Sequence, residues 1–111
     1  MADPTDPTAI DFSALAWEDE APGIRARARE LEGSRWAVVE YGPGVRREEW
    51  CPDGHRGWVI VGAIEYAFDD GHAPLRAGAG EAFRLPSGVA HRGRNLENAP
   101  TRLFLIDDPG H

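Results

Sequence analysis

Apolar and polar residues alternate strictly over residues 24–29, with isoleucine and two alanines on one side and three arginines on the other. A period of two indicates a β-strand, so we expect one face of this segment to be buried and the arginines to face solvent. A turn at Gly33 leads into a second apolar run over residues 35–41. The two segments are therefore predicted to form a hairpin.

The rest of the chain reads as further short apolar runs separated by Gly, Pro and Asn. The longest run, residues 58–68, is interrupted by Gly62, which in a strand indicates a bulge or a close backbone approach. We expect the remaining strands at residues 45–51, 74–77, 81–85, 91–95 and 102–106. About eight short strands without a helical period predict an all-β, antiparallel barrel or sandwich.

The first 22 residues differ from the rest in composition, because they contain three prolines and six acids but no base. We expect a flexible acidic arm over residues 1–22, one β-barrel domain over residues 23–108 and a short tail over residues 109–111. The arm has one short apolar patch, which is expected to dock on the barrel or on a neighbouring subunit. Its members are Phe12, Leu15 and Trp17.

Charge narrows the range of partners. The formal net charge of -7 is concentrated in the arm: 19 acids less the arm's six leaves 13 against 12 bases, or -1, for residues 23–111. A nearly neutral domain without a basic, aromatic-rich run is not expected to bind nucleic acid. All 12 bases are arginine, which excludes Schiff-base chemistry on a lysine.

Cys51 is the single cysteine, so the chain forms no internal disulfide and is compatible with a reducing compartment. No stretch approaches the roughly 20 apolar residues that span a bilayer, and the N-terminus lacks the basic and apolar regions of a signal peptide. We therefore expect a cytoplasmic protein without a membrane partner.

Residues 80–95, GEAFRLPSGVAHRGRN, carry the strongest motif. A glycine opens a predicted strand, a turn at Pro86 and Gly88 closes it, and the next strand begins at His91. An imidazole on a rigid β scaffold suits a metal ligand, although a hydrogen-bonded histidine at a strand start is the simpler alternative.

This spacing resembles the second motif of the cupin family, G-x5-P-x-G-x2-H-x3-N. The five fixed positions are matched by Gly80, Pro86, Gly88, His91 and Asn95. The resemblance implies a jelly-roll-like double-sheet barrel, commonly a homodimer, with a metal site among inward-facing side chains. It does not by itself imply a reaction, because this architecture hosts many functions.

The family's first motif, G-x5-H-x-H-x3,4-E-x6-G, is matched less directly. Counting back from Gly62 places His55 at the glutamate position, and Cys51 and Glu49 at the two histidine positions. Each replacement is itself a metal-binding side chain. The stretch EWCPDGH also resembles the E-W-C-x-x-G-H variant of some small single-domain cupins, and both motifs together cover roughly residues 20–107.

Together with His91, the resemblance thus implies the metal ligands Glu49, Cys51, His55 and His91. Residues two apart on a strand face the same way, which favours Glu49 with Cys51 over the alternative register, Glu48 with Trp50. The alternatives without metal binding are a turn histidine at His55, an inert buried thiol at Cys51 and a solvent-exposed run of charged residues at Glu49.

Thiolate, imidazole and carboxylate ligands favour zinc, with iron, nickel or cobalt as alternatives. Four bound ligands would make a structural zinc site, whereas a detached Cys51 or Glu49 would open a position for water or substrate. His72, in a turn, and His111, at the terminus, are not candidates. Arg47 is a candidate for holding an anionic substrate, with a surface ion pair as the simpler alternative.

We therefore expect a small metal-binding cupin that binds or transforms a small organic molecule, with dioxygenase or isomerase chemistry as the reaction classes implied by the resemblance. Its catalytic residues are not assigned. The alternative is a non-catalytic binding or sensing module with a structural metal or none. A third hypothesis is a scaffold that oligomerises through the apolar patch of the arm.

Overall fold

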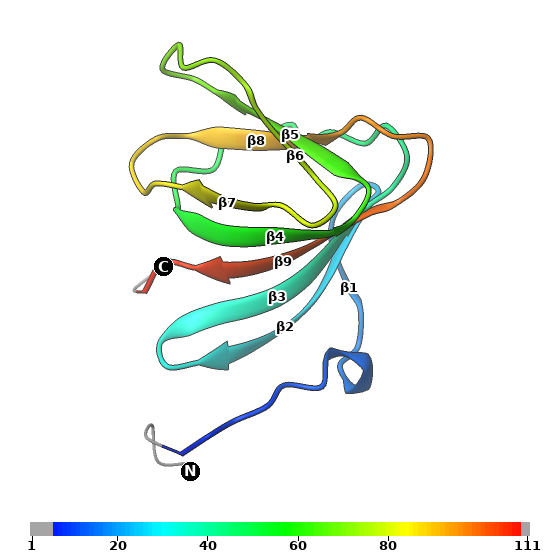
Figure 1. Cartoon of the computed structure of the whole chain (residues 1–111), viewed down its shortest axis with the longest axis vertical. Helices are drawn as coiled ribbons and strands as arrows, with labels where there is room; N and C mark the ends of the chain where they lie inside the picture. Colours follow the sequence, from blue (N-terminus) through cyan, green and yellow to red (C-terminus); the bar gives the residue numbers. More distant parts are fainter. Residues whose placement is uncertain (1–5, 110–111) are drawn as a thin grey trace.

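The computed structural model describes residues 6–109, within which nine strands form two antiparallel sheets that face each other (Figure 1). The larger sheet has the order β1-β2-β3-β9-β4-β7, and the smaller has the order β6-β5-β8. The all-β double-sheet prediction is confirmed. The elements are η1 (Phe12–Ala14), β1 (Glu18–Ala21), β2 (Ile24–Leu31), β3 (Ser34–Tyr41), β4 (His55–Val61), β5 (Ala63–Phe68), β6 (Leu75–Gly78), β7 (Ala82–Leu85), β8 (His91–Asn95) and β9 (Thr101–Asp107).

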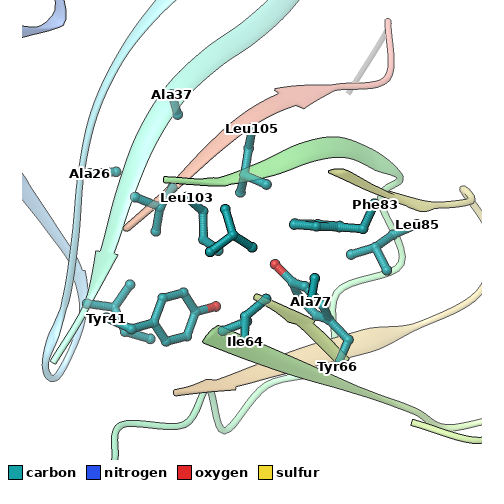
Figure 2. Close-up of a cluster of buried hydrophobic side chains, with 13 residues drawn as sticks. Ala26, Ala37, Tyr41, Ile64, Tyr66, Ala77, Phe83, Leu85, Leu103 and Leu105 are labelled. Atoms are coloured by element: carbon teal, nitrogen blue, oxygen red, sulfur yellow. The ribbon is translucent and has the colours of Figure 1, made fainter. Parts of the chain in front are cut away.

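The core lies between the two sheets and follows the period-two pattern (Figure 2). On β2, Ile24 and Ala26 are buried, and Ala26 lies opposite Val39 of β3 in the predicted hairpin. Ile64 of the smaller sheet and Leu103 of the larger are fully buried between them. Burial of these alternating side chains is what holds the sheets together.

Gly62 divides the long apolar run into two strands that belong to different sheets. Its backbone has a positive φ of 87°, which side-chain-bearing residues rarely adopt. A Cβ at this position would collide with the side chain of Thr101. The predicted interruption is thus the corner where the chain leaves β4 and enters β5.

The N-terminal segment packs against the outer face of the larger sheet. The Trp17 ring lies 4.2 Å from the Arg25 guanidinium carbon and 4.3 Å from that of Arg27. The Phe12 ring packs edge-on against Phe104, with centroids 5.8 Å apart. The arginine face that we expected to be solvated is therefore partly covered by Trp17.

Strand pairing also begins earlier than the predicted domain boundary at residue 23, because β1 pairs with β2 as the edge strand of the larger sheet. Residues 1–5 of the expected arm and residues 110–111 of the expected tail lie outside the described residues. None of the helices in residues 6–109 has the length and apolar character needed to cross a bilayer.

The segment over residues 45–51, predicted as a strand, pairs with β8 only through isolated bridges, and the strand prediction is wrong here. Arg46 lies opposite Arg94 and Cys51 opposite His91, so five residues of this segment (51 − 46) span three residues of β8 (94 − 91). The two extra residues break the regular ladder.

Candidate metal centre

Three of the four predicted ligands converge at one end of the barrel. The ligand atoms of Cys51, His55 and His91 all lie within 4.8 Å of one another. The two imidazole rings meet edge-on, with centroids 5.0 Å apart. His55 begins β4 in the larger sheet and His91 begins β8 in the smaller, so the group joins the two layers.

Backbone pairing explains why Cys51 faces His91. The two residues exchange both backbone hydrogen bonds, at 2.8 and 2.9 Å, across the isolated bridge. Side chains directly opposite in an antiparallel pair lie on the same face. The loop therefore delivers the thiol to the imidazole although the intervening residues are irregular.

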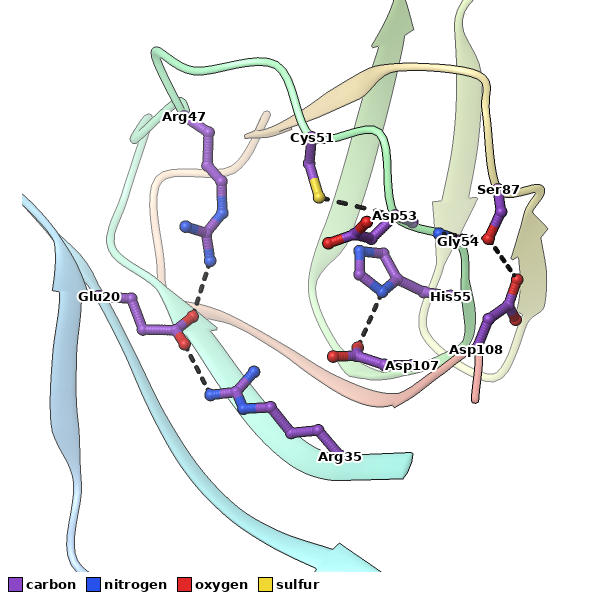
Figure 3. A network of polar contacts seen from close by, with 10 residues as sticks. All are labelled: Glu20, Arg35, Arg47, Cys51, Asp53, Gly54, His55, Ser87, Asp107 and Asp108. Carbon is purple, nitrogen blue, oxygen red and sulfur yellow. Dashed lines mark hydrogen bonds and ion pairs between the residues drawn. The ribbon is translucent and has the colours of Figure 1, made fainter. Parts of the chain in front are cut away.

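Asp107 orients His55. The carboxylate oxygen Oδ1 of Asp107 lies 2.9 Å from Nδ1 of His55, and the two residues are opposite each other in the β4–β9 register (Figure 3). This hydrogen bond occupies one ring nitrogen and leaves Nε2 for a metal, the usual arrangement of metal-ligating histidines. Sequence reasoning missed Asp107, but period two along β9 carried the signal, since Thr101, Leu103 and Leu105 all face inward.

The pKa values of Cys51 and His55 set the charge states that a metal would meet. The neighbouring imidazoles of His55 and His91 lower the pKa of the Cys51 thiol to about 6, against the opposing effect of partial burial. Burial acts to lower the pKa of His55, but Asp107 and the Cys51 thiolate outweigh it and raise that pKa to about 9. The thiol is thus mostly thiolate at neutral pH, which is the form that binds metals.

Glu49 lies outside the group formed by the other three predicted ligands, and its side chain is exposed. The prediction that residues 49 and 51 share a face assumed a continuous strand. The two extra residues of this segment interrupt the strand, so the assumption does not hold. Glu49 still lines the same cavity, so its role as a fourth ligand stays a prediction.

A cavity of about 350 Å³ opens onto the three ligands. Its volume is at the lower end of the range for small-molecule sites. The side chains of Tyr41, Tyr66, Arg47 and Trp50 also line it. A larger and more open depression of about 490 Å³ follows the β1–β2 hairpin, but none of the three ligands borders it, so we place the site in the smaller cavity.

Two glycines make room around the cavity. A Cβ on Gly93 would lie 2.8 Å from the Tyr41 hydroxyl oxygen and 3.1 Å from Cε1 of Tyr66. A Cβ on Gly54 would collide with Asp108 and crowd Ser87. Both glycines are therefore required by close packing next to the ligands.

The remaining candidates occupy other places. His72 is exposed and lies next to Asp70, while His111 lies outside the described residues. Among the aromatic side chains, Phe83 joins the core, and Trp58 is 47% exposed. Trp50 lies at the cavity, where its ring stacks with the Arg92 guanidinium at 4.3 Å.

The fold and the site define a class: an antiparallel double-sheet barrel with a cavity at one end that Cys51, His55 and His91 line. The chain has the cupin fold, as its similarity to solved cupin structures shows. No family model matches the sequence, and no curated protein matches it.

Three solved structures illustrate the similarity. A RmlC-like cupin from Shewanella frigidimarina superposes with a TM-score of 0.75 at 14% identity, covering 96% of this chain and 94% of that one. The cupin domain of Cnp3 from Schizosaccharomyces pombe gives 0.74 at 15% identity, covering 91% and 73%. The polyketide cyclase RemF from Streptomyces resistomycificus gives 0.75 at 15% identity, covering 96% and 83%.

Proposed function

We propose that this chain is a small metal-binding cupin that binds and transforms a small organic molecule in its cavity. The observation that carries the proposal is the convergence of one thiol and two imidazoles within 4.8 Å, drawn from both sheets, at the wall of a 350 Å³ cavity. The similarity to a polyketide cyclase supports small-molecule chemistry on this fold.

The residues fit a divalent metal of the zinc type. A tetrahedral zinc with bonds of about 2.0–2.3 Å needs its ligand atoms roughly 3–4 Å apart, which small side-chain shifts of Cys51, His55 and His91 would supply. The thiolate favours zinc over calcium or magnesium, with iron, nickel and cobalt as the alternatives. When bound, the metal would supply Lewis-acid polarisation of a substrate oxygen.

The chain's own residues would perform the remaining tasks. With Glu49 outside the group, three protein ligands leave a coordination position for water or substrate, which is typical of catalytic rather than structural zinc sites. Asp107 holds the His55 ring in place. Tyr66 and Leu105 give the cavity wall an aromatic and an aliphatic surface for an organic substrate.

The experiment is metal analysis of protein purified without added ions. We expect about one equivalent of zinc or another transition metal per chain, and loss of that metal in His91→Ala. His72→Ala is the matched control, because His72 is exposed and lies away from the group. Metal-free wild-type protein, or a His91→Ala variant with full metal content, would contradict the proposal.

A non-catalytic binding module is the second candidate. It is favoured by the contacts that the group makes without a metal, because both imidazoles interact with the Cys51 thiol and Asp107 bonds to His55. Cys51→Ser separates the two candidates. Retained fold with lost turnover points to catalysis, whereas unfolding on metal loss points to a structural site.

A further inference from the structure

The cavity wall opposite the three ligands carries a group of charged side chains that the proposed metal chemistry does not use. Glu20, on the edge strand β1, bonds to Arg47 at 2.8 Å through Oε1 and to Arg35 at 2.6 Å through Oε2 (Figure 3). All three line the cavity. Two guanidinium groups thus share one carboxylate, which leaves one positive charge in excess within this group.

A bulge in β1 places Glu20 in this position. Asp19 pairs with Arg25 and Ala21 with Ile24, so Glu20 is the extra residue without a partner in the ladder. Bulges are frequent where a strand must re-aim a side chain beside a site. The bulge turns Glu20 towards Arg47, which comes from the irregular loop before Cys51.

Arg47 still has binding capacity. Its Nε donates to the Tyr41 hydroxyl at 3.1 Å and its Nη2 donates to Glu20. Among residues 6–109, no hydrogen-bond partner meets the third nitrogen, Nη1, and 29% of the side chain is exposed. A guanidinium presents its donors in one plane, which matches the two oxygens of a carboxylate.

Tyr66 supplies a second polar group without a partner. Its residue is only 2% exposed, and it borders the cavity beside His91, with ring centroids 5.6 Å apart. The hydroxyl points towards the middle of the barrel (Figure 2), and none of the hydrogen bonds among residues 6–109 involves it. A hydroxyl at the cavity wall that has no hydrogen-bond partner in the protein is available to a ligand in the cavity.

We infer that the cavity takes a small organic carboxylate, whose carboxylate group binds Arg47 and whose other end lies at the Tyr66 hydroxyl and the Cys51–His55–His91 group. This inference deepens the proposed function by naming its substrate class, and it rests on that function in taking the cavity as the substrate site. A carboxylate fits better than a phosphate, because Arg35 and Arg47 already converge on the two oxygens of one carboxylate.

The test compares acids with their matched amides. Benzoate, succinate, benzamide, succinamide and inorganic phosphate are titrated into the protein as purified, with binding followed by ligand-observed NMR and metal content measured on the same samples. We expect at least one carboxylate to bind wild type at least tenfold more tightly than its amide or phosphate. Amides or phosphate that bind as tightly, or a wild type that binds neither acid, would overturn the inference.

Variants assign the binding to the named residues. Arg47→Gln is expected to weaken carboxylate binding at least tenfold, and Tyr66→Phe about fivefold. Arg46→Gln is the matched control, because Arg46 is exposed and its ion pair within residues 6–109 is with Glu48, and it should stay within twofold. Arg47→Gln with unchanged carboxylate affinity would overturn the inference.

If Arg47→Gln does not fold, Glu20→Gln still tests the inference. It removes a negative charge from the same group, so its effect on binding should be opposite to that of Arg47→Gln. Removing the Glu20 charge should tighten carboxylate binding about two- to fivefold, whereas weaker binding would overturn the electrostatic account. Metal content separates this inference from the proposed function. If metal-free protein binds carboxylates through Arg47, the inference holds and the proposed metal centre is refuted. If metal-loaded protein binds no carboxylate, the metal centre stands and the inference is refuted.

Discussion

Strand β8 carries a buried polar residue at each end, and the two have different environments. Asn95 at one end is 1% exposed and His91 at the other is 2% exposed. Asn95 has full hydrogen bonding: its Nδ2 reaches three backbone carbonyls, and its Oδ1 accepts two hydrogen bonds. The carbonyls are those of Tyr41, Gly42 and Ala99, and the donors are the Glu97 amide and the Thr101 hydroxyl.

His91 instead faces a cavity. Its Nδ1 lies 3.4 Å from the Val89 carbonyl, a long contact, and its ring meets Cys51, His55 and Tyr66. His91 and Asn95 are both buried, and both occupy fixed positions of the same motif. Neither property therefore distinguishes a structural residue from a functional one. The difference is in the partners: Asn95 bonds mainly to backbone groups and so holds the fold, whereas His91 interacts with the Cys51 thiol beside a cavity and is available to a ligand there.

The largest expected effect is on the free energy of unfolding, at the Asn95 end of β8. Asn95→Ala would remove five hydrogen bonds from a buried site, so we expect a loss of about 4 kcal/mol in the free energy of unfolding. Asn98→Ala, at an exposed loop position, should change it by less than about 0.5 kcal/mol. Urea denaturation measures both, and a loss below about 1 kcal/mol for Asn95→Ala would remove the contrast between the two ends.

At the His91 end of β8, we expect the affinity of the Cys51–His55–His91 group for zinc to depend steeply on pH. Cys51, with a pKa of about 6, is deprotonated above that pH, but His55, with a pKa of about 9, must release a proton to bind a metal. Affinity should therefore rise about tenfold per pH unit from pH 6 to 8, or roughly a hundredfold in total. Competition with a chelator measures it, and a flat profile would show that His55 binds no metal.

Removing the support of His55 should have a smaller effect on the same equilibrium. Asp107→Asn takes away the carboxylate that orients the ring, and we expect zinc affinity to fall about ten- to a hundredfold. The pH profile should also flatten, because the pKa of His55 falls with the loss of Asp107. Asp108→Asn is the matched control, since Asp108 bonds to Ser87 instead. Equal losses in both variants would assign the effect to general disruption.

The smallest effect concerns Glu40, on the outer face and away from both ends of β8. Burial acts to raise its pKa, but hydrogen bonds from Arg102 and Arg25 outweigh it and lower that pKa below 4.5. A depressed carboxyl pKa stabilises the fold above the unfolded pKa, and this contribution is lost as pH falls through the folded value. Glu40→Gln should cost about 1 kcal/mol at pH 7 and less below about pH 4.5. A loss that is equal at pH 3 and pH 7 would contradict this assignment.

Much of the fold was predictable because it depends on local pattern. Alternation placed β2 and β3, Gly62 marked the corner between the sheets, and motif spacing placed His91 at the start of β8. Counting along the first motif also brought Cys51 and His55 to His91, which the structure places together. Each of these features can be predicted from a short stretch of sequence or from the spacing within one motif.

The rest of the site depends on register and irregularity, which the sequence does not state. Asp107 reaches His55 because β9 lies beside β4 in one particular register. Glu20 reaches Arg47 because β1 has a bulge. Glu49 stays outside the ligand group because the loop before Cys51 carries two more residues than a strand would. The homodimer implied by the family resemblance stays a prediction.

The most direct test is X-ray diffraction from crystals of protein purified without added metal, with data collected on both sides of the zinc, iron, nickel and cobalt absorption edges. We predict one anomalous peak within about 2.0–2.3 Å of the Cys51 sulfur and of one nitrogen from each of His55 and His91. Crystals of metal-replete protein in which these three side chains contact only one another, with the ion bound elsewhere, would contradict the account.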